Sequence, residues 1–290
     1  MADKQDTELW TVLRMLEWTT GFFKEKKIPD PRHSIEWLLA DVLNCKRLDL
    51  YLQYERPLSS AELNTLRPLI KRRAGHEPLQ YITGSANFMG LHIRVEPSVL
   101  IPRIETEQLV ELLLDQTSHA EDEPLSLLDI GTGSGCIALA VKKFRPAWHC
   151  TGTDISDKAL SVASANANHN QLDVQFVHGD LFNPGSLDSP KGGWDIIVSN
   201  PPYIAPKERA GLEPQVTEYE PGKALFHENP LDVYRSVIQY AHQCTSTLFL
   251  ELNDRLAGDI HNIALNTYPS AKLYNDLDKN PRFLTAVPSS

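Results

Sequence analysis

The sequence has little that would support a metal centre, a disulfide framework or a membrane span. Its 290 residues include four cysteines, which are scattered and form no C-x-x-C pair, so neither a zinc site nor a set of disulfides is indicated. No stretch approaches the roughly 18 apolar residues of a membrane-spanning helix, and the amino-terminal residues lack the apolar core of a signal peptide. We therefore expect a cytoplasmic protein with reduced thiols, no metal and no membrane partner.

An excess of positive charge is also missing. Asp and Glu number 38 against 28 Lys and Arg, which gives a net charge of -10. Proteins that bind nucleic acid by neutralising many phosphates usually carry the opposite sign, so we expect no direct nucleic-acid partner. The hydrophobic content of 41% is enough for one large or two modest domains.

The first 85 residues predict a small helical domain, because apolar side chains recur there at helical spacing. The expected helices cover residues 7–27, 32–43 and 59–75. Ser59 followed by Glu62 fits a capping box at the start of the third helix, and Pro68 should kink or divide that helix. The domain shows no catalytic constellation, so it is either a stable appendage or a recognition element for a macromolecular partner.

A change of pattern marks the end of the helical domain. Residues 88–95 nearly alternate between apolar and polar side chains, with Gly90 as a bend, and they predict a β-hairpin. We place this hairpin in a linker of residues 86–102. Another helix is expected around residues 109–114, where apolar side chains return to helical spacing.

The remaining residues, 103–290, predict an α/β domain. Beyond residue 125, apolar runs typical of buried strands alternate with helical patterns, which indicates a parallel sheet covered on both faces. The expected strands cover residues 125–129, 149–154, 174–178, 194–199, 247–252, 272–274 and 283–287, and the expected helices 134–143, 157–168, 231–242 and 254–265. A long loop should precede the helix at 231–242.

A glycine-rich loop, Gly131-Thr132-Gly133-Ser134-Gly135, joins the first strand of this domain to the helix after it. Doubly wound sheets bind nucleotide-like ligands at this position, and glycine lets a ligand approach the backbone closely. The phosphate-binding G-x-x-x-x-G-K-[ST] pattern is absent because no lysine follows. Cys136 also breaks the dinucleotide spacing. The loop by itself is equally consistent with a tight turn.

Two carboxylates stand at the ends of the next two strands. Asp154 is placed to accept hydrogen bonds from ribose hydroxyls, and Asp180 to accept from an adenine amino group, with Leu181 packing on the ring. A glycine loop without phosphate-binding features, combined with these carboxylates, favours an adenosyl ligand that carries a sulfonium. We therefore expect S-adenosylmethionine as the cofactor. Asp154 alone would also be consistent with a helix cap.

Asn200-Pro201-Pro202-Tyr203 follows the apolar run at 196–198 and should form a loop at the carboxyl end of a buried strand. An amide nitrogen is a poor nucleophile, because its lone pair is delocalised into the carbonyl group. The Asn200 side-chain oxygen and the Pro201 carbonyl are acceptors that would orient a planar amide and stabilise charge developing on its nitrogen. Pro202 fixes the loop, and Tyr203 can stack on the substrate. The alternative interpretation is a rigid turn.

Three segments resemble the HemK/PrmC glutamine methyltransferases. They are Ile-Pro-Arg-Ile-Glu-Thr-Glu at 101–107, the segment 128–138 with its glycine loop, and Asn-Pro-Pro-Tyr-Ile at 200–204. Enzymes of that family methylate the side-chain amide of the Gly-Gly-Gln motif in class 1 peptide chain release factors. Asn-Pro-Pro-Tyr alone is shared with enzymes that methylate amino groups of DNA and RNA. The Ile-Pro-Arg segment and the helical domain make the resemblance specific, and it covers nearly the whole chain.

The resemblance implies a Rossmann-like class I methyltransferase sheet, joined by the β-hairpin linker to a small N-terminal helical domain that recognises the release factor. It implies that S-adenosylmethionine is held by Gly131, Thr132, Gly133, Ser134, Gly135, Asp154, Asp180, Leu181 and Asn200. The glutamine would be held by Asn200, Pro201, Pro202, Tyr203 and Arg103, of which Asn200, Pro201 and Tyr203 are the expected catalytic residues. We expect a monomer that acts in translation termination.

The chain departs from the family pattern at three places. Ile104 stands where a second proline is usual, His227-Glu228-Asn229-Pro230 replaces a glycine-rich loop, and residues 250–253 lack the glycine that usually follows the glutamate. None of these positions belongs to the expected cofactor or amide-binding residues.

Three alternative functions fit parts of the same pattern. An enzyme that methylates adenine in nucleic acid would use the same Asn-Pro-Pro-Tyr loop, but it must flip its base and bind phosphates. A sister enzyme methylates a glutamine in a large-subunit ribosomal protein. A non-catalytic adenosyl-binding partner of another methyltransferase would have no need of Asn200 and Tyr203.

Overall fold

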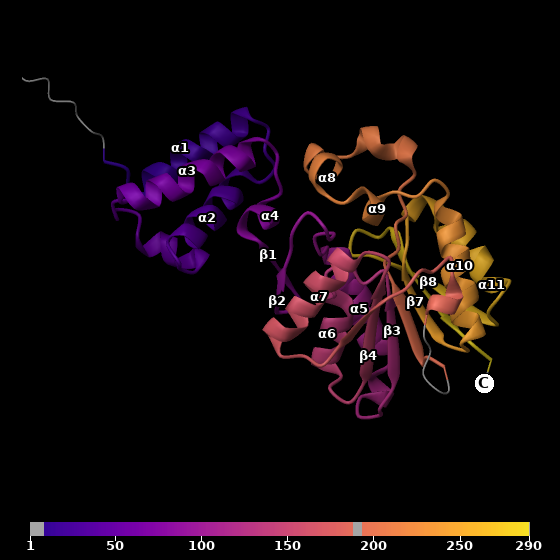
Figure 1. Ribbon diagram of the computed structural model, residues 1–290. Helices are drawn as coiled ribbons and strands as arrows, with labels where there is room; N and C mark the ends of the chain where they lie inside the picture. Colours follow the sequence, from indigo (N-terminus) through magenta and orange to yellow (C-terminus); the bar gives the residue numbers. More distant parts are fainter. Residues whose placement is uncertain (1–8, 188–192, 290) are drawn as a thin grey trace, which may run out of the picture. The chain divides into compact units, whose positions relative to one another are not determined.

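The structure is a computed structural model that describes residues 9–187 and 193–289. It divides into two compact units, whose elements are labelled in Figure 1. The helical unit comprises Met1–Gly84 together with Pro214–Tyr219, and the α/β unit comprises Ser85–Glu213 and Glu220–Ser290. The helical unit thus takes in a short segment from far along the sequence.

The helical unit contains the three helices expected from the apolar spacing. Its elements are α1 (Val12–Glu25), α2 (Pro31–Val42), the 3₁₀ helix η1 (Arg47–Leu52), α3 (Ser60–Ala74), α4 (Leu79–Thr83) and α8 (Pro214–Tyr219). The predicted capping box is confirmed, because the Glu62 amide donates to Ser59 Oγ and Glu62 Oε2 accepts from the Ser59 amide. Pro68 is exposed and does not divide α3, since water can bond the carbonyl that loses its partner.

The hairpin that opens the α/β unit is also confirmed. Strand β1 (Ser85–Phe88) pairs antiparallel with β2 (Leu91–Arg94). The two residues between them, Met89 and Gly90, have φ angles of 49° and 70°. Two successive positive φ values are typical of the type I′ turn, whose twist matches that of the flanking strands.

The central sheet has seven strands in the order β5-β4-β3-β6-β7-β9-β8. Their bounds are β3 (Ser126–Ile130), β4 (His149–Asp154), β5 (Gln175–His178), β6 (Ile196–Ser199), β7 (Thr247–Glu251), β8 (Ser270–Asn275) and β9 (Pro281–Val287). Strands β3 to β7 are parallel, as predicted. The prediction was wrong for β9, which is antiparallel to both neighbours. Only residues 276–280 join β8 to β9, and so short a connection forms a hairpin rather than a crossover.

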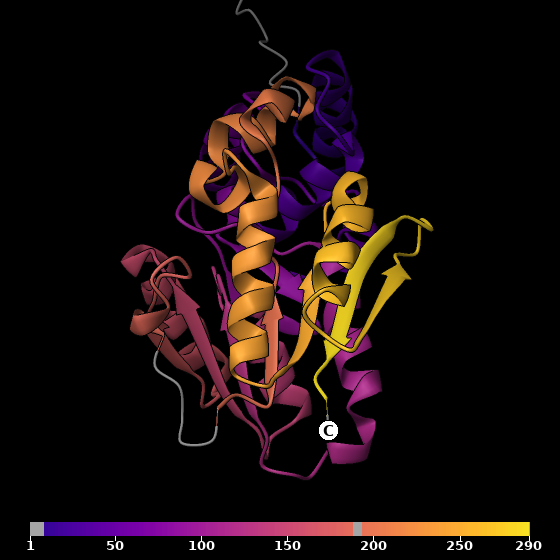
Figure 2. The same ribbon diagram turned by 90° about the vertical axis from the view of Figure 1, so that its right-hand side faces the viewer.

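Helices cover both faces of the sheet. They are α5 (Ile104–Gln116), α6 (Cys136–Phe144), α7 (Asp157–Asn170), α10 (Pro230–Gln243) and α11 (Ala257–Leu265). Figures 1 and 2 show α5, α6 and α7 on one face and α10 and α11 on the other. In the part of the chain that the structure describes, no helix is long and apolar enough to cross a membrane.

The segment expected as a long loop after β6 contains short helices. They are η4 (Pro206–Gly211), α8 and α9 (Gly222–Leu225). Further 3₁₀ turns lie elsewhere in the α/β unit, at η2 (Ser118–Ala120), η3 (Pro184–Ser186) and η5 (Asp254–Leu256). Elements this short carry too few apolar positions to show a helical period in the sequence.

The register of the parallel strands determines where the site lies. Ile130 of β3 pairs with Thr153 of β4 on one side and with Ser199 of β6 on the other, and Ser199 pairs with Leu250 of β7. The next residue along each of these four strands therefore lies at the same edge of the sheet; these residues are Gly131, Asp154, Asn200 and Glu251. The chain also reverses its winding between β3 and β6, where doubly wound sheets bind their ligands.

Gly152 of β4 keeps the space that the glycine loop needs for packing. A Cβ atom there would lie 2.6 Å from Thr132 Oγ1 and 2.7 Å from the Phe176 ring. We predict that Gly152→Ala lowers the free energy of unfolding by about 2 kcal/mol, because a well-packed core resists added volume. Denaturant titration measures the change.

Gly258→Ala in α11 is the matched control. A Cβ atom at Gly258 would have nothing within 4 Å, so the free energy of unfolding should stay constant or rise by about 0.5 kcal/mol. Equal destabilisation by both substitutions would contradict the packing argument.

Candidate active site

The glycine loop between β3 and α6 exposes its backbone at the carboxyl edge of the sheet. The φ angles of Gly131, Gly133 and Gly135 are 74°, 55° and 81°. The Gly131 and Thr132 amides both donate to the Thr153 carbonyl at 2.9 Å, which fixes the loop over the end of β4. Gly131 is exposed, and a Cβ atom there would have nothing within 4 Å. The loop therefore leaves open space in which a ligand can approach the main chain.

Asp129 lies beneath this loop and is fully buried. Its Oδ2 accepts from Thr132 Oγ1 at 2.6 Å and from the Ala138 amide at 3.4 Å, whereas Oδ1 has no hydrogen-bond partner among the described residues. Burial raises the pKa of Asp129 to about 7, and the charge of Asp154 adds to this rise. A buried acceptor without a protein donor is a position that a ligand or a bound water would complete.

Asp154 contacts the glycine loop directly. Its Oδ2 accepts from the Gly133 amide at 3.0 Å and its Oδ1 from the Ser156 amide at 2.9 Å. The interpretation of Asp154 as a helix cap is wrong, because Ser156 caps α7 by accepting from the Ala159 amide. Each carboxylate oxygen of Asp154 keeps a lone pair for a further donor such as a hydroxyl group.

Asp180 and Leu181 lie in a turn after β5. Asp180 Oδ1 accepts from the Phe182 amide at 2.9 Å, and Leu181 packs against the core of the α/β unit. The ring of Phe182 stacks on that of His227, with 5.5 Å between centroids and 14° between planes. His227 belongs to the loop that departs from the family pattern, so this loop contacts the turn that contains Asp180.

The residues at this edge fit the expected cofactor. An exposed glycine backbone, a half-buried carboxylate with spare lone pairs and an orphaned buried acceptor match the hydroxyl, amino and ammonium donors of S-adenosylmethionine. Within residues 9–187 and 193–289, no group of three or more His, Cys, Asp or Glu side chains is placed to hold a metal ion.

Asn200 follows β6 and is the first residue of a hydrogen-bonded chain. Its Nδ2 donates to Thr106 Oγ1 at 3.0 Å, and Thr106 Oγ1 donates to Glu251 Oε2 at 2.8 Å. The hydroxyl of Tyr203 donates to the other oxygen of Glu251, Oε1, at 3.4 Å. Two of the expected catalytic residues are therefore connected to one carboxylate.

Neither Thr106 nor Glu251 is among the site residues predicted from the sequence. Both are almost completely buried, with relative exposures of 3% and 1%. The signal that could have found Glu251 is its position at the carboxyl end of the apolar strand β7, where a carboxylate needs polar partners. Thr106 lies in α5, and its pairing with a residue 145 positions away is a product of the fold.

The electrostatics of Glu251 reflect its burial. Burial raises the pKa of Glu251 to about 7, the hydrogen bond from Thr106 and the charge of Arg282 lower it, and the charge of Glu105 raises it. Burial also raises the pKa of Tyr203, and the charge of Glu251 raises it further. Tyr203 is thus a neutral phenol that donates to Glu251.

The rest of the Asn-Pro-Pro-Tyr loop is held by burial of its prolines and by a hydrogen bond from Asn253. Pro201 is buried, Pro202 is half-buried, and the Tyr203 carbonyl accepts from Asn253 Nδ2 at 3.1 Å. Asn253 lies in the segment that lacks the usual family glycine. Its side chain therefore fastens the Asn-Pro-Pro-Tyr loop in this chain.

Arg103 lies just before α5 and pairs with Glu220. Its Nη2 donates to Glu220 Oε1 at 2.5 Å. Burial raises the pKa of Glu220, and the charge and hydrogen bond of Arg103 lower it. About a third of the Arg103 side chain is exposed. A role for Arg103 in holding substrate stays a prediction.

Comparison with solved structures identifies the class of fold. The hMettl16 catalytic domain in complex with MAT2A 3′UTR hairpin 1 is similar with a TM-score of 0.55 and 18% identity, over 76% of this chain and 80% of that one. The N-terminal domain of human METTL16 in complex with SAH is similar with a TM-score of 0.50, over 69% of this chain and 76% of that one. The α/β unit has the class I methyltransferase fold, as the sequence predicted.

Sequence comparison identifies the family. Residues 14–84 match the PrmC N-terminal domain and residues 105–216 the methyltransferase small domain. A release factor glutamine methyltransferase of Geobacter sulfurreducens is 43% identical over 81% of this chain and 80% of its own length. A release factor glutamine methyltransferase of Chlorobaculum tepidum is 36% identical over 97% of this chain and 99% of its own length. The chain belongs to the release factor glutamine methyltransferase family, which confirms the resemblance stated above.

We predict that Arg103→Ala lowers the free energy of unfolding by about 2 kcal/mol at pH 8, because it leaves the buried Glu220 carboxylate without its counter-charge. The change also raises the pKa of Glu220 further above its unfolded value. The destabilisation that comes from Glu220 in the variant is therefore absent at low pH and grows as pH rises through that pKa. Denaturant titrations at pH 5 and pH 8 should show the smaller deficit at pH 5.

The double variant Arg103→Ala/Glu220→Gln is the control. It removes both charges and should recover at least half of the loss at pH 8. A double variant as unstable as Arg103→Ala, or a deficit independent of pH, would show that charge pairing is not the cause.

Proposed function

We propose that this protein transfers a methyl group from S-adenosylmethionine to the side-chain amide nitrogen of the glutamine in the Gly-Gly-Gln motif of class 1 peptide chain release factors, and so modulates translation termination. Membership of the release factor glutamine methyltransferase family supports the reaction and the substrate class. The enzyme is then an S-adenosylmethionine-dependent protein-glutamine methyltransferase.

The observation that carries this proposal is the arrangement at Asn200. Its amide nitrogen is committed to Thr106, which leaves its oxygen as an acceptor for an N–H bond of the glutamine. The Pro201 carbonyl accepts the other N–H, and Tyr203 and Pro202 hold the plane of the amide. Orienting the amide in this way directs the nitrogen lone pair toward the methyl donor and stabilises the developing positive charge.

The cofactor residues have separate tasks in this proposal. Gly131 to Gly135 pass close to the ligand, Asp154 accepts from the ribose hydroxyls, and Asp180 with Leu181 holds the adenine. Bound S-adenosylmethionine supplies an electrophilic methyl group. Asn200 follows Ser199, which pairs with the residue before the glycine loop; this position supports a role between cofactor and substrate.

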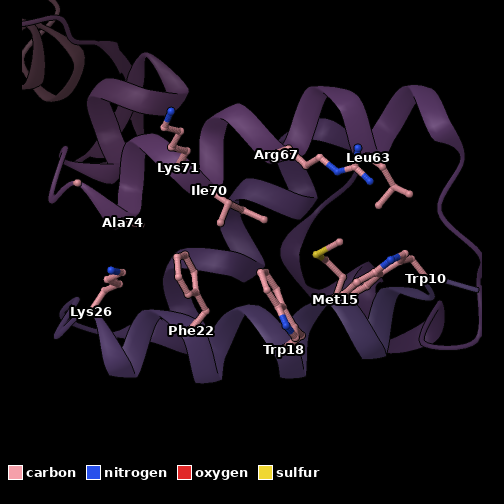
Figure 3. Close-up of a pocket in the computed structure, with 11 residues that line it drawn as sticks. Trp10, Met15, Trp18, Phe22, Lys26, Leu63, Arg67, Ile70, Lys71 and Ala74 are labelled. Carbon is pink, nitrogen blue, oxygen red and sulfur yellow. The ribbon is translucent and has the colours of Figure 1, made fainter. Parts of the chain in front are cut away.

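The helical unit is proposed to recognise the release factor. A groove with a volume of about 460 Å³ runs between α1 and α3, and Figure 3 shows Trp18 and Phe22 of α1 pointing into it. Lys26, Arg67 and Lys71 add positive charge at its rim, in a protein whose net charge is -10. An acidic segment of the release factor with an apolar face has the complementary chemistry.

The location, oligomeric state and partners of the enzyme belong to the same proposal. The enzyme acts as a cytoplasmic monomer on a protein substrate, with no direct contact to nucleic acid and no membrane partner. The net charge of -10 supports the absence of a nucleic-acid substrate.

Transfer of labelled methyl groups tests the function. The enzyme is incubated with labelled S-adenosylmethionine and a class 1 release factor, the same factor with its motif glutamine changed to alanine, or duplex DNA and RNA hairpins. We expect label only on the factor with the glutamine. Label on nucleic acid, or equal label on both factors, would overturn the proposal.

Asn200→Ala distinguishes the amide clamp from the cofactor site. Since the clamp acts on the glutamine, we expect kcat to fall by at least about 100-fold, as for loss of a preorganised hydrogen-bonding group. The Kd for S-adenosylmethionine, measured by calorimetry, should change little. Unchanged turnover would exclude the proposed role of Asn200.

Trp18→Ala tests the groove. Because Trp18 is 53% exposed and stacks on Phe22 within the groove, we expect the KM for the release factor to rise about tenfold, which corresponds to about 1.4 kcal/mol of lost binding. The KM for S-adenosylmethionine should not change. Trp37→Ala is the control, since Trp37 lies on α2 outside the groove and is 36% exposed. Equal effects of the two substitutions would contradict the assignment.

A further inference from the structure

We propose that Glu251 and Thr106 are positioning residues of the methyl transfer: the Glu251 carboxylate, acting through the Thr106 hydroxyl, holds the Asn200 amide with its oxygen toward the substrate. This inference rests on the proposed function of Asn200. It concerns two side chains that neither touch the glutamine nor belong to the glycine loop.

The direction of the hydrogen bonds follows from the chemistry of the three groups. An ionised carboxylate has no proton to donate, so the hydrogen bond of 2.8 Å between Glu251 and Thr106 uses the single proton of the threonine hydroxyl. What Thr106 presents to Asn200 is then a lone pair. Only the NH₂ side of the Asn200 amide can bond to it, at 3.0 Å, and the amide oxygen must face the other way.

The hydrogen-bond partners of the Asn200 amide fix which of its two ends faces Thr106. Nitrogen and oxygen of an asparagine are ordinarily distinguished by their hydrogen-bond partners. Here the carboxylate sets the polarity of the whole chain. A reversed amide would place its oxygen against the lone pairs of Thr106 and its NH₂ group against the N–H bonds of the glutamine.

Burial keeps water from competing for the hydrogen bonds of this chain of groups. Thr106 and Glu251 are 3% and 1% exposed, so water does not offer Thr106 an alternative partner. Buried polar networks have large energetic consequences, because an unsatisfied member is costly and a satisfied one is rigid. The carboxylate is therefore fixed in place rather than averaged over rotamers.

The backbone of Glu251 is held in place as well. The hydroxyl of Tyr234 donates to the Glu251 carbonyl at 3.2 Å and accepts from the Asn253 amide at 3.1 Å. The second carboxylate oxygen accepts from the Tyr203 hydroxyl at 3.4 Å. One carboxylate thus orients both the acceptor and the aromatic ring of the Asn-Pro-Pro-Tyr loop.

Protonation of Glu251 would remove this control. A neutral carboxyl group can donate to Thr106, which frees the threonine proton to bond the oxygen of a reversed Asn200 amide. Activity should therefore require the ionised form. Burial raises the pKa of Glu251 to about 7, so the change of state falls in an accessible pH range.

Several other groups face Glu251 from the elements packed around it. Arg282 of β9 lowers its pKa and Glu105 of α5 raises it, while Tyr203 lies on the loop after β6 and Tyr234 on α10. The charge of Glu251 also raises the pKa of Cys136 on α6. Asp129 has a pKa of about 7 as well, so the test compares the pH profile of the wild type with that of a Glu251 variant.

The first experiment compares Thr106→Val with Thr106→Ser, using the full chain and a release factor as substrate. Valine keeps the shape but removes the hydroxyl, and we expect kcat to fall about tenfold or more, since one oriented hydrogen bond contributes about 1 to 1.5 kcal/mol. Serine keeps the hydroxyl and should restore kcat to within about threefold of the wild type, on the same reasoning. The KM for the release factor and the Kd for S-adenosylmethionine should stay within about twofold in both variants, because the Thr106 hydroxyl bonds to Glu251 and Asn200 rather than to a ligand.

The second experiment uses Glu251→Gln, which keeps the volume but can donate to Thr106. We expect its kcat to resemble that of the wild type at low pH and to lose the rise through about pH 7 that ionisation of Glu251 gives the wild type. The titration of Asp129 remains in both proteins and cancels in the comparison. If Glu251→Gln does not fold, Thr106→Val and Thr106→Ser still test whether the hydroxyl that links Glu251 to Asn200 positions the amide.

The outcomes separate this inference from the proposed function. A wild-type enzyme that does not methylate the release factor defeats the proposed function itself. An active wild type with a Thr106→Val variant of unchanged kcat overturns the positioning role, and so does a Thr106→Ser variant as impaired as Thr106→Val. Loss of folding stability without a change in kcat in the threonine variants would assign Thr106 to the core alone.

Discussion

The pairing of β3, β4, β6 and β7 in one parallel register is the constraint on which the site depends. Because Ile130, Thr153, Ser199 and Leu250 lie side by side across the sheet, the residue after each of them starts at the same edge. A slip of one residue in a single strand would turn its side chains to the opposite face and separate these groups. The buried apolar strands that enforce this register are thus also what aligns the candidate cofactor loop with the candidate amide clamp.

Two buried carboxylates stand at this edge, and each accepts a hydrogen bond from a threonine. Asp129 accepts from Thr132 beneath the glycine loop, and Glu251 accepts from Thr106 beside Asn200. Burial raises the pKa of both to about 7. Since these values exceed those of the unfolded chain, the stability contributed by the neutral forms is present at low pH and is lost as pH rises through about 7. Ionised carboxylates at this edge therefore reduce stability, and carboxylates with perturbed pKa values cluster at functional sites.

The sequence predicted the fold where a pattern is local. Apolar periodicity found the helices of the helical unit and the parallel strands, and Ser59 with Glu62 marked a helix start. It did not predict the direction of β9 or the short helices after β6, because these depend on connection length and on elements too short to show a period. For the site, strand ends indicated Asp154 and Asn200. The link between Thr106 and Glu251 joins residues 145 positions apart, and no spacing in the sequence encodes it.

The chain passes from the helical unit to the α/β unit at the end of α8, between Tyr219 and Glu220. Tyr219 belongs to the helical unit, where its hydroxyl donates to the Gly75 carbonyl at 2.8 Å. The next residue, Glu220, belongs to the α/β unit and is fixed there by Arg103. The ion pair therefore anchors the chain at the point where it leaves α8. A substitution of Arg103 would therefore release the chain at Glu220 whether or not Arg103 contacts a substrate.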